Sequence, residues 1–295
     1  MTDRKRSEVD WEDIWVFLAL ARHGSLSAAA RVLGVTHATV ARRLRSLERS
    51  LGGGRLVERR PEGYVLNPAG MQALAVAGEM EGAAQALARD AGDGMPSGLI
   101  RINAPPGVAL GFLTARLASI AARYTALDID LATNLRSVSL DRHEADIAIR
   151  MGRPDDGDMI AKPLVTVGFG LYGTDGACRR IEDGAPPVFV GFDEADASMP
   201  DAQWLSRHFP HARVAFRANN HYAQAIAARA GVGIAVLPHY IGRSDPALRI
   251  VDLGAAPPPR DLFILTRTRD RRDFAIRAVA DDIARAFAEE RALFE

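Results

Sequence analysis

The sequence predicts an α/β protein that begins with a mainly helical module. Two features of the apolar pattern support this. Up to residue 89, apolar residues recur at the three- and four-residue spacing of amphipathic helices. After a segment rich in glycine at 91–98, short apolar runs with the character of strands alternate with helical segments. Such alternation is typical of parallel sheets covered by helices.

Composition bounds the class of protein. With 295 residues, 48% of them apolar and 25% charged, the chain has the length of two or three domains and an ordinary globular composition. It holds no run of eighteen apolar residues, and its N-terminal segment has no apolar signal core. We therefore expect a cytoplasmic protein with no membrane partner. The single cysteine, Cys178, excludes an intramolecular disulfide and argues against a zinc site. It is either a redox sensor or an inert packing residue.

Charge is unevenly spread along the chain, although the formal net charge is zero. Residues 22–60 contain nine arginines and two acids, Glu48 and Glu58, so this segment carries a net charge of +7 (9 − 2). One concentrated basic segment favours local contact with phosphates over a general coat of polyanion.

A helical hairpin lies inside this basic segment. Ser25 is placed to cap one helix, Gly34 to end it in a left-handed conformation, and Thr36 to cap the next. The second helix has its apolar residues on one face: Val40, Leu44 and Leu47. This layout is a helix-turn-helix, whose second helix enters the major groove of DNA. The alternative is a solvated hairpin with an arginine-rich face.

Flanking segments complete a DNA-binding module. The helical pattern at 10–23 supplies a core, and two short strands at 55–58 and 64–66 around a Pro/Gly turn predict a wing. Arginines at its tip can reach the DNA backbone or the minor groove. The residues that we expect to contact DNA are Ser25, Thr36, His37, Ala38, Thr39, Arg42, Arg43, Arg45, Arg59 and Arg60. Of these, His37, Ala38, Thr39 and Arg42 are best placed for base edges, and Arg43 and Arg45 for phosphates.

Segment 11–70 closely resembles the winged helix-turn-helix of LysR-type transcriptional regulators. The matching pieces include Gly24-Ser25-Leu26-Ser27-Ala28-Ala29-Ala30, Val35-Thr36-His37-Ala38-Thr39-Val40-Ala41-Arg42-Arg43-Leu44 and Leu66-Asn67-Pro68-Ala69-Gly70. The resemblance implies a regulator that binds double-stranded promoter DNA. The family commonly has Ser-Gln where Thr36 and His37 stand. Because imidazole cannot form the bidentate amide pattern to adenine, the family's base preference does not carry over to His37.

A long alanine-rich helix is predicted at 68–89, with Pro68 in its first turn. About twenty residues give a helix roughly 30 Å long. The resemblance implies that this linker helix pairs with its copy in a homodimer or homotetramer; a monomeric spacer helix is the alternative. We expect a winged helix-turn-helix domain at 1–67, the linker helix at 68–92 and an effector-binding domain at 98–295.

The remainder resembles the effector domain of the same family. The matching pieces are Leu99-Ile100-Arg101-Ile102, Ala145-Asp146-Ile147-Ala148-Ile149-Arg150 followed by Gly152, and Ala230-Gly231-Val232-Gly233-Ile234-Ala235-Val236-Leu237-Pro238. The resemblance implies two α/β Rossmann-like subdomains hinged like a periplasmic binding protein, subdomain I at 98–165 plus 262–295 and subdomain II at 166–261. We expect strands at 99–103, 129–133, 145–150, 166–172, 187–191, 213–217, 233–236, 249–252 and 262–267, and helices at 108–124, 137–143, 202–208, 220–230 and 270–292.

Ligands of such sheets bind in loops at the carboxyl ends of strands. The expected effector-binding residues are Ala104, Pro105, Pro106 and Gly107, then Asn134, Leu135, Arg136 and Arg150, and across the cleft Asn219, Asn220 and His221. A small effector carrying a carboxylate, held by Arg136 or Arg150, is the most specific hypothesis. A solvated Arg136 and an Arg150 paired with an acidic neighbour are the alternatives.

Motifs of common enzyme classes are missing from the sequence. His143-Glu144 lacks a second histidine four residues on, and neither a P-loop nor a Gly-x-Ser-x-Gly elbow occurs. We therefore expect no catalytic residues, no resident cofactor and no metal. The predicted function is transcriptional regulation through an effector that changes DNA bending or contact with RNA polymerase. The alternative is a small-molecule sensor whose head makes protein contacts only.

Overall fold

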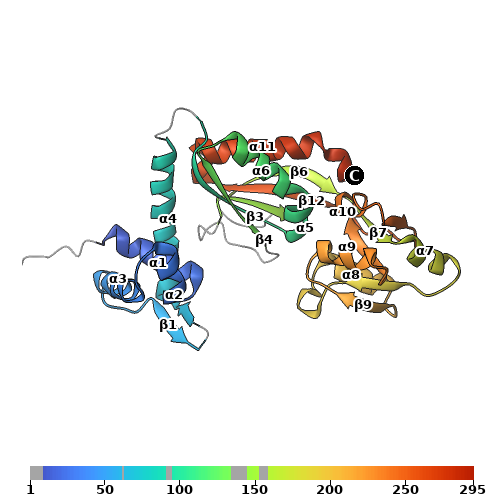
Figure 1. The fold of residues 1–295 in the computed structure, drawn as a ribbon, viewed down its shortest axis with the longest axis horizontal. Helices are drawn as coiled ribbons and strands as arrows, with labels where there is room; N and C mark the ends of the chain where they lie inside the picture. Colours follow the sequence, from blue (N-terminus) through green and yellow to red (C-terminus); the bar gives the residue numbers. More distant parts are fainter. Residues whose placement is uncertain (1–8, 62, 91–94, 134–144, 153–158) are drawn as a thin grey trace, which may run out of the picture. The chain divides into compact units, whose positions relative to one another are not determined.

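The protein forms two compact units in the computed structural model (Figure 1). Residues 9–61, 63–90, 95–133, 145–152 and 159–295 are described. The first unit comprises the described residues up to 90, and the second comprises those from 95 onward. Each unit has its own hydrophobic core, so each is described by itself.

Three helices form the centre of the first unit: α1 (Trp11–His23), α2 (Leu26–Leu33) and α3 (His37–Ser50). Their apolar faces meet in a core that includes the fully buried Phe17 and Val40. The predicted caps are confirmed. Ser25 and Thr36 accept hydrogen bonds from the backbone amides of Ala28 and Thr39, and Gly34 ends α2 in the left-handed region at φ 65°.

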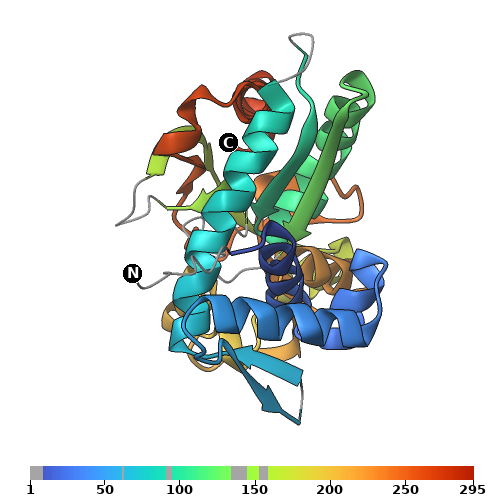
Figure 2. The ribbon, with the colours of Figure 1, turned by 90° about the vertical axis from the view of Figure 1, so that its left-hand side faces the viewer.

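The predicted wing is an antiparallel hairpin of β1 (Val57–Arg60) and β2 (Gly63–Leu66). Figure 2 shows it projecting from the helices of the same unit. The turn end of β2 is tied to the turn after α1, because the amide of Tyr64 donates to the carbonyl of Gly24 at 2.7 Å. At Gly63, with φ 140°, a β-carbon would lie 2.5 Å from that same carbonyl oxygen. Only glycine therefore fits this close approach.

The long helix α4 (Pro68–Asp90) follows the wing directly. Asn67 caps it by accepting from the amide of Gly70 at 2.9 Å, and its amide group donates to the carbonyl of Arg55 at 2.7 Å. Farther along α4, the buried carboxylate of Glu81 forms a two-pronged ion pair with Arg22 of α1. The ion pair thus ties the linker helix to the helical core.

A five-stranded sheet in the order β4-β3-β5-β12-β6 begins the second unit. Its strands are β3 (Gly98–Ala104), β4 (Leu127–Thr133), β5 (Ile147–Met151), β6 (Met159–Val167) and β12 (Arg260–Arg267). The helical elements that belong with it are α5 (Pro106–Val108), a π-helical turn at Ala109–Leu113, α6 (Thr114–Arg123), the 3-10 turns η4 (Thr268–Arg272) and η5 (Arg291–Leu293), and α11 (Phe274–Glu289).

A second five-stranded sheet has the order β11-β7-β10-β8-β9. Its strands are β7 (Phe169–Gly173), β8 (Val188–Gly191), β9 (Arg213–Arg217), β10 (Ile234–Pro238) and β11 (Arg249–Val251). The helices around it are α7 (Asp175–Glu182), a 3-10 turn at Glu194–Asp196, α8 (Pro200–His208), α9 (His221–Arg229) and α10 (His239–Gly242). The chain passes between the sheets near Gly168 and again between β11 and β12.

Three expectations need correction. Both sheets are mixed, because β12 runs antiparallel to β5 and β6, and β7 runs antiparallel to β10 and β11. The strand expected at 166–172 is two strands, since the chain changes sheets at Gly168. Helices α7 and α10 are not expected from the sequence. The helix expected at 137–143 lies outside the described residues. No described helix is long and apolar enough to cross a membrane.

Candidate functional site

The exposed side of α3 carries most of the predicted DNA-contacting residues. His37, Ala38, Arg42 and Arg45 are exposed and Thr39 is partly exposed, while the apolar face of the helix is buried. Ser25 and Thr36 use their hydroxyl groups as helix caps. The capped N-terminus of α3 thus presents a surface of short polar side chains with Arg42 beside it, which suits entry into the major groove.

Arg43 differs from its neighbours in α3. Its guanidinium faces the start of α1, where it lies 3.1 Å from Asp13 and 3.7 Å from Asp10 and also pairs with Glu12. Three carboxylates therefore surround the Arg43 guanidinium, which the sequence predicts to contact DNA phosphates. The structure does not bring Arg43 together with the exposed set, and its principal contact is within the unit.

Arginines of the wing are exposed as predicted. Arg59 and Arg60 both lie in β1, and Arg60 is 3.7 Å from the carboxylate of Glu58. Glu48, the other acid of the basic segment, accepts from the amide of Leu56 at 2.9 Å and so ties α3 to the start of the wing. This hydrogen bond anchors the start of the wing to α3.

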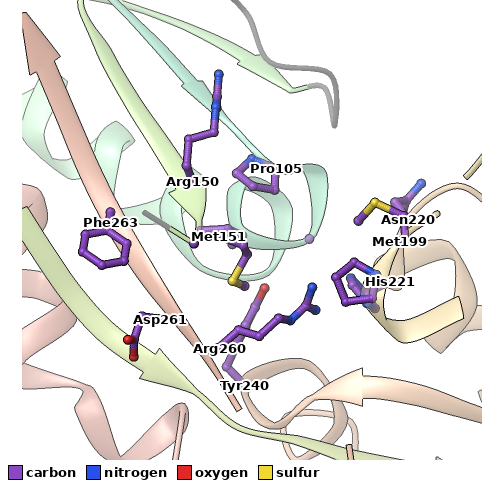
Figure 3. Close-up of a pocket in the computed structure, with 14 residues that line it drawn as sticks. Pro105, Arg150, Met151, Met199, Asn220, His221, Tyr240, Arg260, Asp261 and Phe263 are labelled. Atoms are coloured by element: carbon purple, nitrogen blue, oxygen red, sulfur yellow. The ribbon is translucent and has the colours of Figure 1, made fainter. Parts of the chain in front are cut away.

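A cavity of about 680 Å³ lies between the two sheets of the second unit (Figure 3). Five of the predicted effector-binding residues line it: Pro105, Gly107, Arg150, Asn220 and His221. Ala104, Pro106 and Asn219 do not line it, and Asn134, Leu135 and Arg136 lie outside the described residues. The lining residues that the sequence did not indicate are Val108, Met151, Gly152, Met199, Pro200, Tyr240, Arg260, Asp261 and Phe263.

A buried cluster of charged and polar side chains stands at one side of the cavity. Arg260, the first residue of β12, donates from Nη2 to both carboxylate oxygens of Asp201, at 3.0 and 2.8 Å. Nε2 of His221, the first residue of α9, lies 2.7 Å from Oδ2 of the same carboxylate. Figure 3 shows the Arg260 guanidinium pointing toward His221. One acid therefore holds both side chains in place at the cavity.

The electrostatics of this cluster follow from its burial. Asp201 is only 5% exposed. Burial alone would raise its pKa, but the hydrogen bond and charge of His221, together with Arg260, outweigh burial and lower the pKa of Asp201. The guanidinium of Arg260 also lies over the ring of Phe169, 4.3 Å from its centroid. The carboxylate stays ionised, and the cation beside it is held in one orientation.

Arg150 lines the cavity from the end of β5. Its Nη1 donates to the carbonyl of Ile149 at 2.8 Å, and burial lowers the pKa of its guanidinium. Figure 3 shows the guanidinium directed away from Arg260. The two arginines therefore offer two separate positions for an anionic group.

Two of the lining residues that the sequence analysis did not predict occupy positions with a weak sequence signal. Arg260 follows Pro257-Pro258-Pro259 and opens an apolar strand, and Tyr240 comes two residues after the strand-ending Pro238. Both positions lie where the chain leaves or enters a strand, which is where ligand sites of such sheets form. Asp201 does not line the cavity itself, and nothing local in the sequence pairs it with residues 20 and 59 positions away.

Two family models match the chain. Residues 11–71 match the model described as "Bacterial regulatory helix-turn-helix protein, lysR family", and residues 93–288 match the "LysR substrate binding domain". The chain belongs to the LysR family of transcriptional regulators. The helix-turn-helix of this regulator is a DNA-binding element, and its second unit is the substrate-binding domain of the family. The expectation that the protein is a regulator and not an enzyme is confirmed, since its named relatives are transcriptional regulators.

Individual relatives agree with this assignment. The regulator is 28% identical over 289 residues to the Mau operon transcriptional activator of Paracoccus denitrificans, covering 95% of this chain and 98% of the relative. It is 34% identical over 156 residues to the AhcY transcriptional activator HvrB of Rhodobacter capsulatus, covering 50% of this chain and 52% of the relative.

Solved structures share the fold. ArgP from Mycobacterium tuberculosis has a TM-score of 0.68 at 20% identity, covering 95% of this chain and 98% of that one. A full-length variant of OxyR from Pseudomonas aeruginosa has a TM-score of 0.68 at 15% identity, covering 97% of this chain and 96% of that one. The predicted architecture of a helix-turn-helix followed by two α/β subdomains is confirmed.

Proposed function

We propose that this regulator binds a small anionic effector, a carboxylate, in the cavity between its two sheets. The observation that carries the proposal is the buried cluster of Arg260, Asp201 and His221 at the cavity. Nε of Arg260 is buried and has no hydrogen-bond partner among the described residues. Because Asp201 occupies Nη2, the other nitrogens of the guanidinium remain as donors, and a carboxylate accepts strong charge-assisted hydrogen bonds from such donors.

The remaining lining defines the rest of the effector. Pro105, Val108, Met151, Met199 and Phe263 give the cavity apolar walls. A volume of about 680 Å³ is that of a typical small-molecule site. We therefore infer a carboxylate on an apolar body. Because Asp201 balances the charge of Arg260, a ligand with one negative charge suits the cavity better than a polyanion.

The cavity also suggests how the effector acts. Arg150 and Phe263 belong to the first sheet, and His221 and Met199 lie beside the second, so a ligand that contacts both sides stabilises one arrangement of the subdomains over another. We propose that linker helices pair two or four subunits, and that the subdomain change alters DNA bending or contact with RNA polymerase. Such a protein acts in the cytoplasm, on the chromosome. A head that makes protein contacts only is disfavoured by the match to a helix-turn-helix family.

A ligand screen on the full-length protein tests the effector class. Small carboxylates and their uncharged amides are compared pairwise by thermal shift, because a ligand of the native state raises its apparent stability. We expect a carboxylate to stabilise the wild type, its amide to have no effect, and Arg260→Gln to remove the stabilisation. Arg217→Gln, at an exposed arginine of the same unit, is the matched control. A stabilising ligand without an anionic group, or one that binds the Arg260→Gln variant equally well, would contradict the proposal.

A further inference from the structure

A second basic surface lies in the effector-binding unit. The turn η4 and the first turn of α11 enclose a shallow hollow of about 620 Å³. Its lining consists of one hydroxyl residue and four arginines, all exposed: Thr268, Arg269, Arg271, Arg272 and Arg277. We call this set the arginine patch.

Among the described residues, acids pair with one member of the arginine patch, Arg269. Asp270 is bonded to Arg267 at 2.5 Å and lies 4.0 Å from Arg269, and Asp273 caps α11 by accepting from the amide of Ile276. Arg271, Arg272 and Arg277 form no ion pair with any residue that the structure describes. Three like charges therefore stand together at the surface, and a bound anion would relieve their repulsion.

The patch is separate from the effector cavity. Strand β12 begins with Arg260 at the cavity and ends with Arg267, immediately before η4. Eight residues of strand span roughly 26 Å. The patch therefore lies at the opposite end of the first sheet, and Figure 1 shows α11 running back along that sheet toward the second one.

The chain from the DNA-binding unit enters the second unit at this same end. Strand β3, which starts at Gly98, runs parallel to β5, and β5 runs antiparallel to β12. The register pairs Ile102 with Ile147, and Ile147 with Thr266. The start of β3 and the end of β12 therefore lie toward the same end of the sheet, with β5 between the two strands. Because both units belong to one chain, DNA held by the helix-turn-helix is tethered to the second unit, which raises its effective concentration at the arginine patch.

We propose that the arginine patch binds DNA phosphates outside the segment that the helix-turn-helix reads, as a sequence-independent second contact. Guanidinium groups bind phosphate oxygens in bidentate fashion, and Thr268 supplies a hydroxyl donor. All the lining side chains are exposed, which suits an extended backbone more than an enclosed small molecule. The inference rests on DNA binding by the helix-turn-helix and adds a contact from the effector-binding unit.

Salt dependence of DNA affinity tests the proposal on the full-length protein. Affinity is measured between about 50 and 200 mM salt for two duplexes: the regulator's own upstream region, and a duplex trimmed to the footprint of the helix-turn-helix. The test variant is Arg271→Gln/Arg272→Gln/Arg277→Gln. The control variant, Arg179→Gln/Arg180→Gln/Arg213→Gln, removes three exposed arginines from the second subdomain of the same unit.

On the long duplex we expect the test variant to lower the steepness of log K against log salt by about 0.9 for each phosphate that it no longer neutralises, up to about 3 per subunit. On the trimmed duplex, and for the control variant on both, the slope stays that of the wild type. Equal slopes on the long duplex would overturn the proposal. Equal slopes with reduced polymerase-dependent transcription would assign the patch to an acidic protein surface instead. A wild type that does not prefer its upstream region to random DNA would remove the specific DNA binding on which the inference rests.

Discussion

The DNA-binding head and the effector cavity build their sites in different ways. In the head, the residues best placed for base edges lie on one helix, α3, whose caps and apolar face are local in sequence. In the cavity, the residues that hold charge come from α8, α9 and β12, and Asp201 and Arg260 are 59 positions apart. The head therefore presents independent side chains on a rigid support, whereas the cavity depends on a coupled cluster. The effects of substitutions should therefore be additive in the head and non-additive in the cavity cluster.

Asp201→Asn gives the largest expected effect. It leaves the partly buried Arg260 without its counter-charge and the buried His221 without its carboxylate partner, which costs about 3 kcal/mol of unfolding free energy. Denaturant unfolding followed in the cavity-bearing unit measures the loss. Asp252→Asn, at an exposed acid of the same unit, should change stability by less than about 0.5 kcal/mol. A loss of the same small size at Asp201 would show that the cluster is not coupled.

Gly63→Ala tests the rigidity of the head. The added β-carbon would meet the carbonyl oxygen of Gly24 at 2.5 Å, in a backbone conformation that favours glycine. We expect the head to lose about 2 kcal/mol and the wing to shift, with weaker DNA binding as a consequence. Gly53→Ala, also at positive φ but with no atom within 4 Å of the added carbon, separates the contact from backbone strain. Equal losses in the two variants would mean that the wing is not anchored at Gly24.

Local signals explain how much of the molecule could be predicted from the sequence. Ser25, Gly34 and Thr36 act through hydrogen bonds and backbone conformations within four residues, so the sequence predicts their roles correctly. Helical spacing predicts that Arg43 contacts DNA, because its position lies outside the buried apolar face of α3. The carboxylate partners of Arg43 are about 30 positions away in α1, where periodicity gives no information about side-chain pairing.

The cavity is only partly predictable for the same reason. Loops after strands β3 and β5 and before α9 are recognisable, and Pro105, Arg150 and His221 do line the cavity. The contribution of Arg260 depends on β12 returning to the first sheet antiparallel to its neighbours, which strand and helix alternation does not reveal. Tertiary topology, more than local pattern, assembles that side of the site.

Arg42→Ala and Arg43→Ala form a matched pair within one helix. Arg42 is exposed and Arg43 is engaged by Asp10, Glu12 and Asp13. We expect Arg42→Ala to weaken binding to the upstream region about tenfold, since a good base contact is worth about 1–3 kcal/mol, with little change in stability. We expect Arg43→Ala to lower the unfolding free energy by about 1 kcal/mol and to weaken DNA binding less. Anisotropy titration and thermal unfolding measure the two effects, and the reverse ranking would return Arg43 to the DNA surface.

His239 gives the smallest expected effect, which is confined to the cavity-bearing unit. Its Nδ1 lies 2.7 Å from the hydroxyl of Tyr172, and burial, with the charge of Arg243, lowers the pKa of its imidazole. The unfolded chain therefore binds a proton at a higher pH than the folded one, so stability is present above the unfolded pKa of about 6.5 and declines as the pH falls below it. His239→Gln keeps a polar partner for Tyr172 without the titration. Its stability should fall less steeply between about pH 7 and 5.5, whereas His211→Gln, at an exposed histidine, should follow the wild type. Identical slopes for all three proteins would mean that His239 does not titrate differently on folding.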